Sequence, residues 1–237
     1  MKHAYYYSLI AKTLRFLIPE QKTILCFGVY DNAAILSLNP LNAFCICNKH
    51  NCSHPESSSN IKYIHSAFKD YVPEKKFDYI ILDAALGETE DICKLLKNVF
   101  YGCERHTRII IHQENHLWQP LLKLAGTMGL KNKEKTKNWL SVSDTHTYLK
   151  SSGFEPTRTL NKNIFPLKLG FAGPVINWLC CVFPFFDFFK LDQFIVARPL
   201  MKSPFENEQI DQGLTICITV RDEEANIEPL VVSLPVL

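Results

Sequence analysis

The chain has 237 residues, of which 47% are hydrophobic and 21% are charged, and its formal net charge is +2. This composition excludes an intrinsically disordered chain and a protein with many membrane spans, and the length suffices for one large domain with a sizeable core. Charges of both signs are interspersed along the sequence, so we predict no basic surface and no nucleic-acid partner.

The nine cysteines are odd in number and form no Cys-x-x-Cys pair. This usage is typical of buried thiols in a reducing compartment, and the first residues lack the apolar core of a signal peptide, so we expect a cytoplasmic protein. Cysteines and histidines gather between Cys45 and His54. The Cys45-x-Cys47 spacing differs from a zinc knuckle, however, and we predict no metal site.

The first half of the chain alternates between helical and extended patterns. Apolar residues at helical spacing run from Tyr6 to Leu17, and Pro19 ends this first helix. Apolar runs predict strands over 22–28, 42–47, 61–67, 77–83 and 108–112, and helical patterns cover 31–38, 90–103 and 116–130. Strands that are apolar throughout and alternate with helices indicate a mostly parallel sheet covered on both faces.

Ligands of such sheets bind beyond the carboxyl ends of the strands. The functional residues are therefore predicted within 28–31, 47–50, 66–68, 83–87 and 112–116.

The second half predicts a helix that Ser141 or Ser143 caps and that ends near Ser152, an extended stretch over 155–164 and a last strand over 191–199. Residues 169–186 contain no charge, but their glycines and prolines argue against a regular membrane span. A hydrophobic helix packed on the domain and an interfacial segment touching a membrane both remain open.

Several segments resemble a class I S-adenosylmethionine-dependent methyltransferase domain of the bacterial kind that precedes a family 2 glycosyltransferase. They are Phe77-Asp-Tyr-Ile-Ile-Leu-Asp83 with Leu86-Gly87, His116-Leu-Trp-Gln-Pro-Leu-Leu-Lys, Asn138-Trp-Leu-Ser, Ser152-Gly-Phe-Glu and Phe194-Ile-Val-Ala-Arg-Pro199. The resemblance covers residues 4–199. It implies an α/β fold with a Rossmann-like, doubly wound sheet of seven strands, the last one antiparallel.

The tail over 214–230 is similar to the opening strand and nucleotide-sugar turn of a glycosyltransferase. The resemblance therefore implies a methyltransferase-like domain over 1–199, a linker over 200–213 and a truncated start of a second domain over 214–237. It also implies a small-molecule or lipid-linked sugar as methyl acceptor, and contact of 169–186 with the inner face of a membrane.

The resemblance implies that S-adenosylmethionine binds at the ends of the first four strands. The residues carried over are Phe27, Gly28, Val29, Tyr30, Cys47, Ala67 and Asp83. The cofactor motif is degraded, because only Gly28 matches the glycines of the family's first loop and Tyr30 stands where a later glycine belongs. Cys47, or Asn48 next to it, takes the place of the carboxylate that holds the ribose.

Three residues are candidates for catalysis at the open end of the sheet: Asp83, Glu114 and His116. Asp83 stands where the family places a residue beside the methyl group, but it could equally cap a helix. His116 could likewise cap the helix that it precedes. Two functions follow as hypotheses, a methyltransferase with weakened cofactor binding and a non-catalytic module that serves a glycosyltransferase or a membrane partner.

Overall fold

The computed structural model describes residues 4–28, 32–47, 60–127, 138–163, 187 and 189–201. The helices within them are α1 (Ala4–Leu17), α2 (Asn32–Leu36), α3 (Ala85–Glu88), α4 (Ile92–Tyr101), the 3-10 helix η1 (His116–Trp118), α5 (Gln119–Thr127) and α6 (Val142–Ser151). The strands are β1 (Thr23–Phe27), β2 (Asn42–Cys47), β3 (Ile61–His65), β4 (Tyr79–Asp83), β5 (Arg108–Glu114), β6 (Phe154–Lys162) and β7 (Asp192–Pro199).

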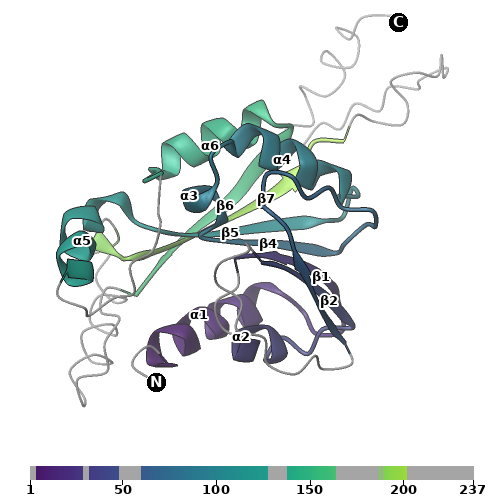
Figure 1. The fold of residues 1–237 in the computed structure, drawn as a ribbon, viewed down its shortest axis with the longest axis horizontal. Coiled ribbons are helices and arrows are strands. Elements are labelled where there is room, and N and C mark those ends of the chain that lie inside the picture. The colour runs from purple at the N-terminus through teal and green to yellow at the C-terminus, as the bar shows by residue number, and fades with distance from the viewer. Residues whose placement is uncertain are drawn as a thin grey trace, which may run out of the picture. The chain divides into compact units, whose positions relative to one another are not determined.

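The seven strands form one sheet in the order β3-β2-β1-β4-β5-β7-β6 (Figure 1). Strands β1 to β5 pair in parallel, and β7 inserts antiparallel between β5 and β6. This arrangement confirms the expected doubly wound sheet with an antiparallel last strand. Because the order reverses between β1 and β4, the carboxyl ends of these two strands flank the topological switch point of the sheet.

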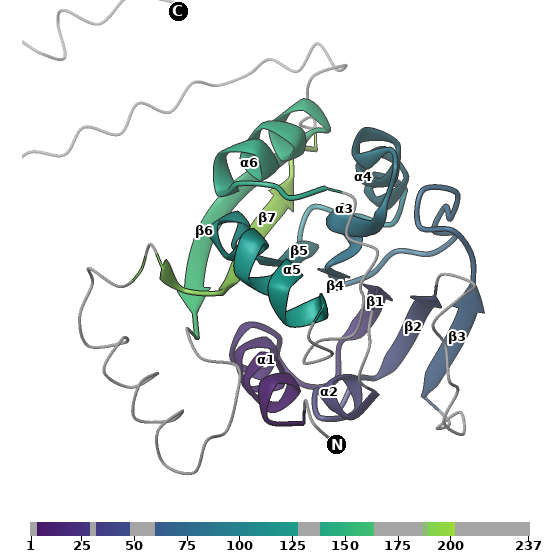
Figure 2. The ribbon, with the colours of Figure 1, turned by 60° about the vertical axis from the view of Figure 1, so that its left-hand side comes forward.

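Helices cover both faces of the sheet, with α1 and α2 on one side and α3, α4 and α6 on the other (Figures 1 and 2). Successive residues of β1 alternate between the two cores, because side chains of a strand point to opposite faces. Ile24 and Cys26 pack with α1 and α2, whereas Leu25 and Phe27 pack with α4 and α6. Both faces are therefore buried, which explains the uninterrupted apolar strands.

Most predicted elements are present with small changes at their ends. Ser141 caps α6 through a reciprocal capping box with Asp144, which decides between the two serines that the sequence offered. The single helix expected over 116–130 begins instead as η1, which Asn115 caps, and continues as α5. The short α3 has no counterpart among the predictions.

Parts of the expected organisation concern residues that lie outside the described ranges. These are the apolar stretch 169–186 and the truncated second domain with its opening strand within 214–230, so the domain boundaries near 199 and 213 stay predictions. None of the helices within the described ranges is long and apolar enough to cross a membrane.

Candidate functional site

The carboxyl ends of β1 and β4 meet at Gly28, where the backbone has a φ of 78°. A Cβ atom built on Gly28 would lie 2.1 Å from the backbone carbonyl oxygen of Asp83. Only glycine tolerates both this conformation and this approach. The glycine therefore lets two backbones come together at the switch point, and it forms the floor of any ligand site there.

The side chain of Asp83 binds His112, the next carboxyl-terminal position along the sheet. The two residues are register partners of β4 and β5, and His112 Nδ1 lies 2.6 Å from Asp83 Oδ1. His112 Nε2 lies 3.4 Å from Asp192 Oδ1 at the start of β7. The imidazole is 4% exposed and stacks on Phe194, with ring centroids 4.7 Å apart. A buried imidazole thus stands between two carboxylates at the open end of the sheet.

Two further donors complete the shell of Asp192, which is fully buried. The Tyr6 hydroxyl of α1 donates to Asp192 Oδ1 at 2.7 Å, and Asn163 Nδ2 donates to Asp192 Oδ2 at 2.7 Å. Each oxygen of this carboxylate therefore has a short hydrogen bond, as a buried charge requires. The network ties α1 to the strands β4, β5 and β7.

The network fixes the protonation of its members. Burial on its own lowers the pKa of His112, but the hydrogen bonds and charges of Asp192 and Asp83 outweigh it and raise that pKa to about 10. Burial, reinforced by the charge of Asp192, raises the pKa of Tyr6 well above its ordinary value. At neutral pH the site therefore holds an imidazolium ion and a neutral phenol whose hydroxyl donates a hydrogen bond.

A pocket opens beside this network, over the carboxyl ends of β4 and β5. It has a cavity volume of about 40 Å³ and is lined by Ala84, Gly87, Gln113, Glu114, Asn138, Trp139 and Leu140. Ala84, the residue that precedes α3, has a φ of 52°, a conformation that is costly for a residue with a Cβ atom. Its backbone N–H donates to the carbonyl oxygen of His112 at 3.0 Å, which joins the pocket rim to the buried network.

Glu114 is the predicted catalytic residue that the structure brings into this pocket. It is also the register partner of Asp192, so it ends β5 directly beside the buried network. His116 instead begins η1 near the start of α6. Hydrogen bonds from Ser141 lower the pKa of Asp144 there, and the nearby His116 adds to the effect. His116 is not among the pocket-lining residues, and its shielded Nδ1 has no hydrogen-bond partner.

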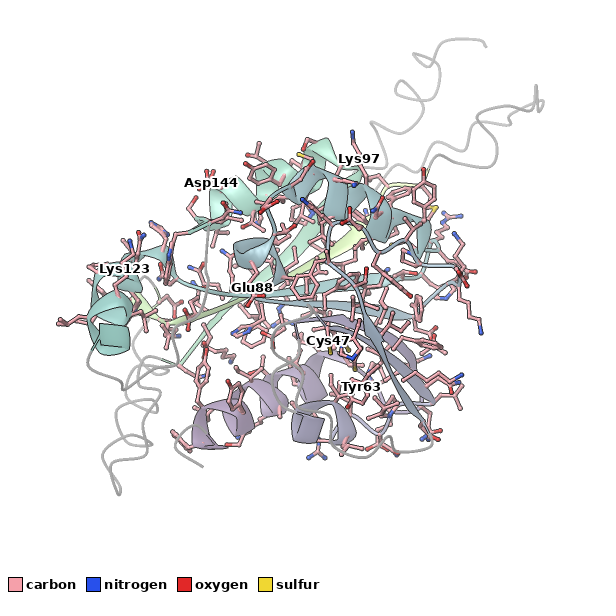
Figure 3. The ribbon with its side chains drawn as sticks, viewed as in Figure 1. Cys47, Tyr63, Glu88, Lys97, Lys123 and Asp144 are labelled. Atoms are coloured by element: carbon pink, nitrogen blue, oxygen red, sulfur yellow. The ribbon has the colours of Figure 1, made fainter. Side chains whose placement is uncertain are left out.

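The residues expected to hold S-adenosylmethionine fit it in part. Gly28 supplies a cradle that a side chain would fill, and Asp83 ends the neighbouring strand. The thiol of Cys47, however, is buried at the end of β2, where the ribose would need a carboxylate (Figure 3). Phe27 turns its ring into the core against Phe68, with centroids 6.0 Å apart.

Ala67 follows β3, and its carbonyl oxygen accepts the backbone N–H groups of Asp70 and Tyr71. Asp70, three residues after Ala67, pairs on the surface with Lys94 at 2.8 Å. Val29 and Tyr30 lie outside the described residues. Among the residues that are described, no group of histidine, cysteine and carboxylate side chains is arranged to hold a metal ion.

The sequence predictions gave no role to three residues of this region, although His112 lies in the predicted range 112–116. His112 and Asp192 carry the buried network, and Trp139, which stands in one of the segments that carry the resemblance, lines the pocket. The pair of Asp83 and His112 had a signal, because each residue ends an apolar run that was predicted as a strand of a mostly parallel sheet. Asp192 had none, since its place depends on the register of an antiparallel strand 80 residues away.

Comparison with solved structures places this architecture among class I methyltransferases. No protein-family model and no curated protein matches the sequence. An S-adenosylmethionine-dependent methyltransferase of Mesorhizobium loti is 16% identical with a TM-score of 0.57, and the match covers 79% of this chain and 96% of that one.

Two further structures have a similar fold. The match to an S-adenosylmethionine-dependent methyltransferase of Thermotoga maritima has a TM-score of 0.61 at 11% identity and covers 84% of this chain and 91% of that one. A calicheamicin-biosynthesis methyltransferase with bound S-adenosylhomocysteine matches with a TM-score of 0.51 at 12% identity, over 81% of this chain and 54% of the other. The chain therefore has the Rossmann-like fold of these enzymes.

Proposed function

We propose that this chain is an S-adenosylmethionine-dependent methyltransferase domain with weakened cofactor binding. One observation carries the proposal: the strand order reverses between β1 and β4. Because Gly28 has no side chain, the backbones of these two strands can approach each other there, beside Asp83. Open α/β sheets bind their ligands at this switch point. The bound cofactor would supply a methyl group to a nucleophilic atom of the acceptor.

The weak binding follows from Cys47. A carboxylate at the end of β2 would form charge-assisted hydrogen bonds with the ribose, and a buried thiol cannot replace them. The loss of one such bond costs about 1.5–3 kcal/mol, or roughly 10- to 100-fold in affinity. The proposed domain therefore holds its cofactor mainly through backbone contacts at Gly28 and through Asp83.

The acceptor in this proposal is a glycan or a lipid-linked sugar that enters the pocket beside Glu114. The pocket offers the Trp139 indole, the amides of Gln113 and Asn138, and one carboxylate. Such groups hydrogen-bond to hydroxyls and pack against the apolar side of a ring. The resemblance of residues 214–230 to a glycosyltransferase opening supports a sugar as the acceptor and a fused enzyme as the partner.

In this proposal Glu114 receives the proton that an acceptor hydroxyl loses, while Asp83, held by His112, stabilises the positive charge near the transferred methyl group. We expect the chain to transfer a labelled methyl group from S-adenosylmethionine to polyprenyl-linked sugars, measured as label in the organic extract. Glu114→Gln should lower the rate at least roughly 100-fold. Glu104→Gln, at an exposed position, is the matched control and should leave the rate unchanged.

A second candidate, a non-catalytic module that serves a glycosyltransferase or a membrane partner, is favoured by the Cys47 thiol at the ribose position. This module would keep the fold without using the cofactor. A folded chain that neither binds S-adenosylmethionine nor labels any acceptor would support the module and contradict the enzyme.

A further inference from the structure

A row of four side chains connects helix α1 to the carboxyl end of β4. Its members, in order, are Tyr6, Asp192, His112 and Asp83, here called the Tyr6–Asp83 relay. The interacting atoms of consecutive members lie 2.7, 3.4 and 2.6 Å apart. The side chain of Asp83 is 15% exposed, whereas that of Asp192 is fully buried. Asp83 is therefore the member that a ligand at the switch point can reach.

The imidazole of His112 is held in one orientation. Its two nitrogen atoms face different carboxylates, with Nδ1 against Asp83 Oδ1 and Nε2 against Asp192 Oδ1. The Phe194 ring stacks on the imidazole at an interplanar angle of 26°. Rotation of the imidazole would break both contacts with the carboxylates, so His112 keeps Oδ1 of Asp83 in a defined position. The other oxygen of Asp83, Oδ2, is the one that the relay leaves for a ligand.

Tyr6 fixes the far end of the relay. Burial and the charges of Asp192, Glu114 and Asp83 raise the pKa of its phenol well above the ordinary value. The hydroxyl therefore keeps its proton at neutral pH and donates to Asp192 Oδ1, the same oxygen that faces His112 Nε2. Without this hydroxyl, Asp192 Oδ1 would attract the imidazolium more strongly and draw it away from Asp83.

We propose that Tyr6, Asp192 and His112 are positioning residues for cofactor binding, because together they orient the Asp83 carboxylate that meets the positive charge of S-adenosylmethionine. The inference rests on the proposed function and adds to it a residue of α1, a helix that supplies none of the expected cofactor contacts. A carboxylate that is already held in place loses less conformational freedom when the ligand binds. Loss of this orientation should therefore weaken binding about 3- to 10-fold.

Two substitutions of His112 separate its two contacts. The amide of asparagine can take the place of Nδ1 and keep the hydrogen bond to Asp83. The longer side chain of glutamine places its amide at Nε2, beside Asp192, and leaves Asp83 without a partner in the relay. Both variants lose the ring and its positive charge, so they share any general effect on stability or charge.

Calorimetric titration with S-adenosylmethionine compares these variants, and circular dichroism establishes that each is folded at the temperature of the titration. We expect His112→Gln to weaken binding about 3- to 10-fold, whereas His112→Asn should stay within about twofold of the unchanged chain. A residue with a merely structural role would give the two variants the same affinity.

Tyr6→Phe tests whether the relay extends to α1, and it removes only a hydroxyl. It should weaken binding about 2- to 5-fold, but it should cause no further loss in His112→Gln, where the path to Asp83 is already broken. Tyr5→Phe removes a hydroxyl from the preceding residue of α1 and is the matched control, which should bind like the unchanged chain. A second readout needs no cofactor: Tyr6→Phe should shift the nitrogen NMR signals of the His112 ring.

The outcomes separate the inference from the proposed function. Equal affinities of His112→Gln and His112→Asn would overturn the inference alone, as would a Tyr6→Phe variant that binds like Tyr5→Phe. Nitrogen signals of His112 that stay unchanged in Tyr6→Phe would overturn it without reference to the cofactor. An unchanged chain that binds no S-adenosylmethionine would contradict the proposed function, and the inference would fall with it.

Discussion

Gly28 has a positive φ and no room for a side chain. Any other residue at this position would therefore adopt a strained backbone conformation and would also collide with the neighbouring strand. Gly28→Ala must move the Asp83 carbonyl away from a Cβ atom at 2.1 Å or distort β1. We expect the free energy of unfolding to fall by about 3 kcal/mol or more. Urea denaturation measures this change.

Gly126→Ala is the control for this prediction. Gly126 lies in α5, and a Cβ atom built on it meets no heavy atom within 4 Å. Alanine favours a helix by up to about 1 kcal/mol over glycine, so this variant should be as stable as the unchanged chain or more so. Equal losses in both variants would contradict the role given to the contact between Gly28 and Asp83.

Loss of the proton from His112 makes the folded chain less stable at alkaline pH. Its folded pKa of about 10 lies above the ordinary value of 6.5, so the stabilisation is complete below pH 6.5 and is lost as the pH rises through 10. We expect His112→Asn to lower the free energy of unfolding by about 3–5 kcal/mol at neutral pH, because it leaves two carboxylates without their imidazolium. Urea denaturation at several pH values measures both effects.

The difference between the unchanged chain and His112→Asn isolates this group from the other residues that titrate at alkaline pH. That difference should shrink between pH 6.5 and 10. His106→Gln, at an exposed position, should show no comparable trend. A difference that stays constant over this pH window would mean that His112 is neutral in the folded chain.

At the scale of elements, the sequence predicted the strands best. The apolar runs that became β1, β2, β4 and β5 are buried on both faces, and such strands are recognised by composition alone. The four-residue α3 was missed because it is shorter than the two turns that a helical period needs. The change from η1 to α5 was missed because the apolar residues keep a helical spacing across it. Nothing in that spacing distinguishes the 3-10 turn that Asn115 caps from the first turn of an α-helix.

The candidate site was predicted less completely for a related reason. Gly28 and Asp83 each end a predicted strand and Glu114 follows one by two residues, so their common edge could be inferred before the structure was known. Asp192 needed the pairing of β7 with β5, and local patterns do not determine such registers.

The capping box of α6 gives a prediction at this scale. Ser141 Oγ accepts the backbone N–H of Asp144 at 3.1 Å, and the Asp144 side chain accepts the backbone N–H of Ser141 at 3.0 Å. Ser141→Ala should lower the free energy of unfolding by about 1 kcal/mol, because it removes the cap. Ser143→Ala changes a serine within the same helix without touching the cap and should have little effect. Thermal unfolding of both variants shows whether stability is lost through the cap itself or through any serine substitution in α6.

At the scale of the whole molecule, the sheet and its helices make the Rossmann-like fold found in solved methyltransferases, and the proposed cofactor site lies at its switch point. The backbone geometry at Gly28 suits a nucleotide cofactor, whereas Cys47 removes a charged partner for it. A buried imidazolium between two carboxylates braces the same edge of the sheet. Under the proposed function, the domain would thus combine a braced open end with fewer charged contacts to the cofactor.

Calorimetric titration of the folded chain with S-adenosylmethionine and S-adenosylhomocysteine tests this account most directly. We predict saturable binding of each ligand at one site, with dissociation constants on the order of 10 µM to 1 mM because the ribose partner is missing. Absence of heat with either ligand at roughly 10 mM, which lies above this whole range, would contradict the account.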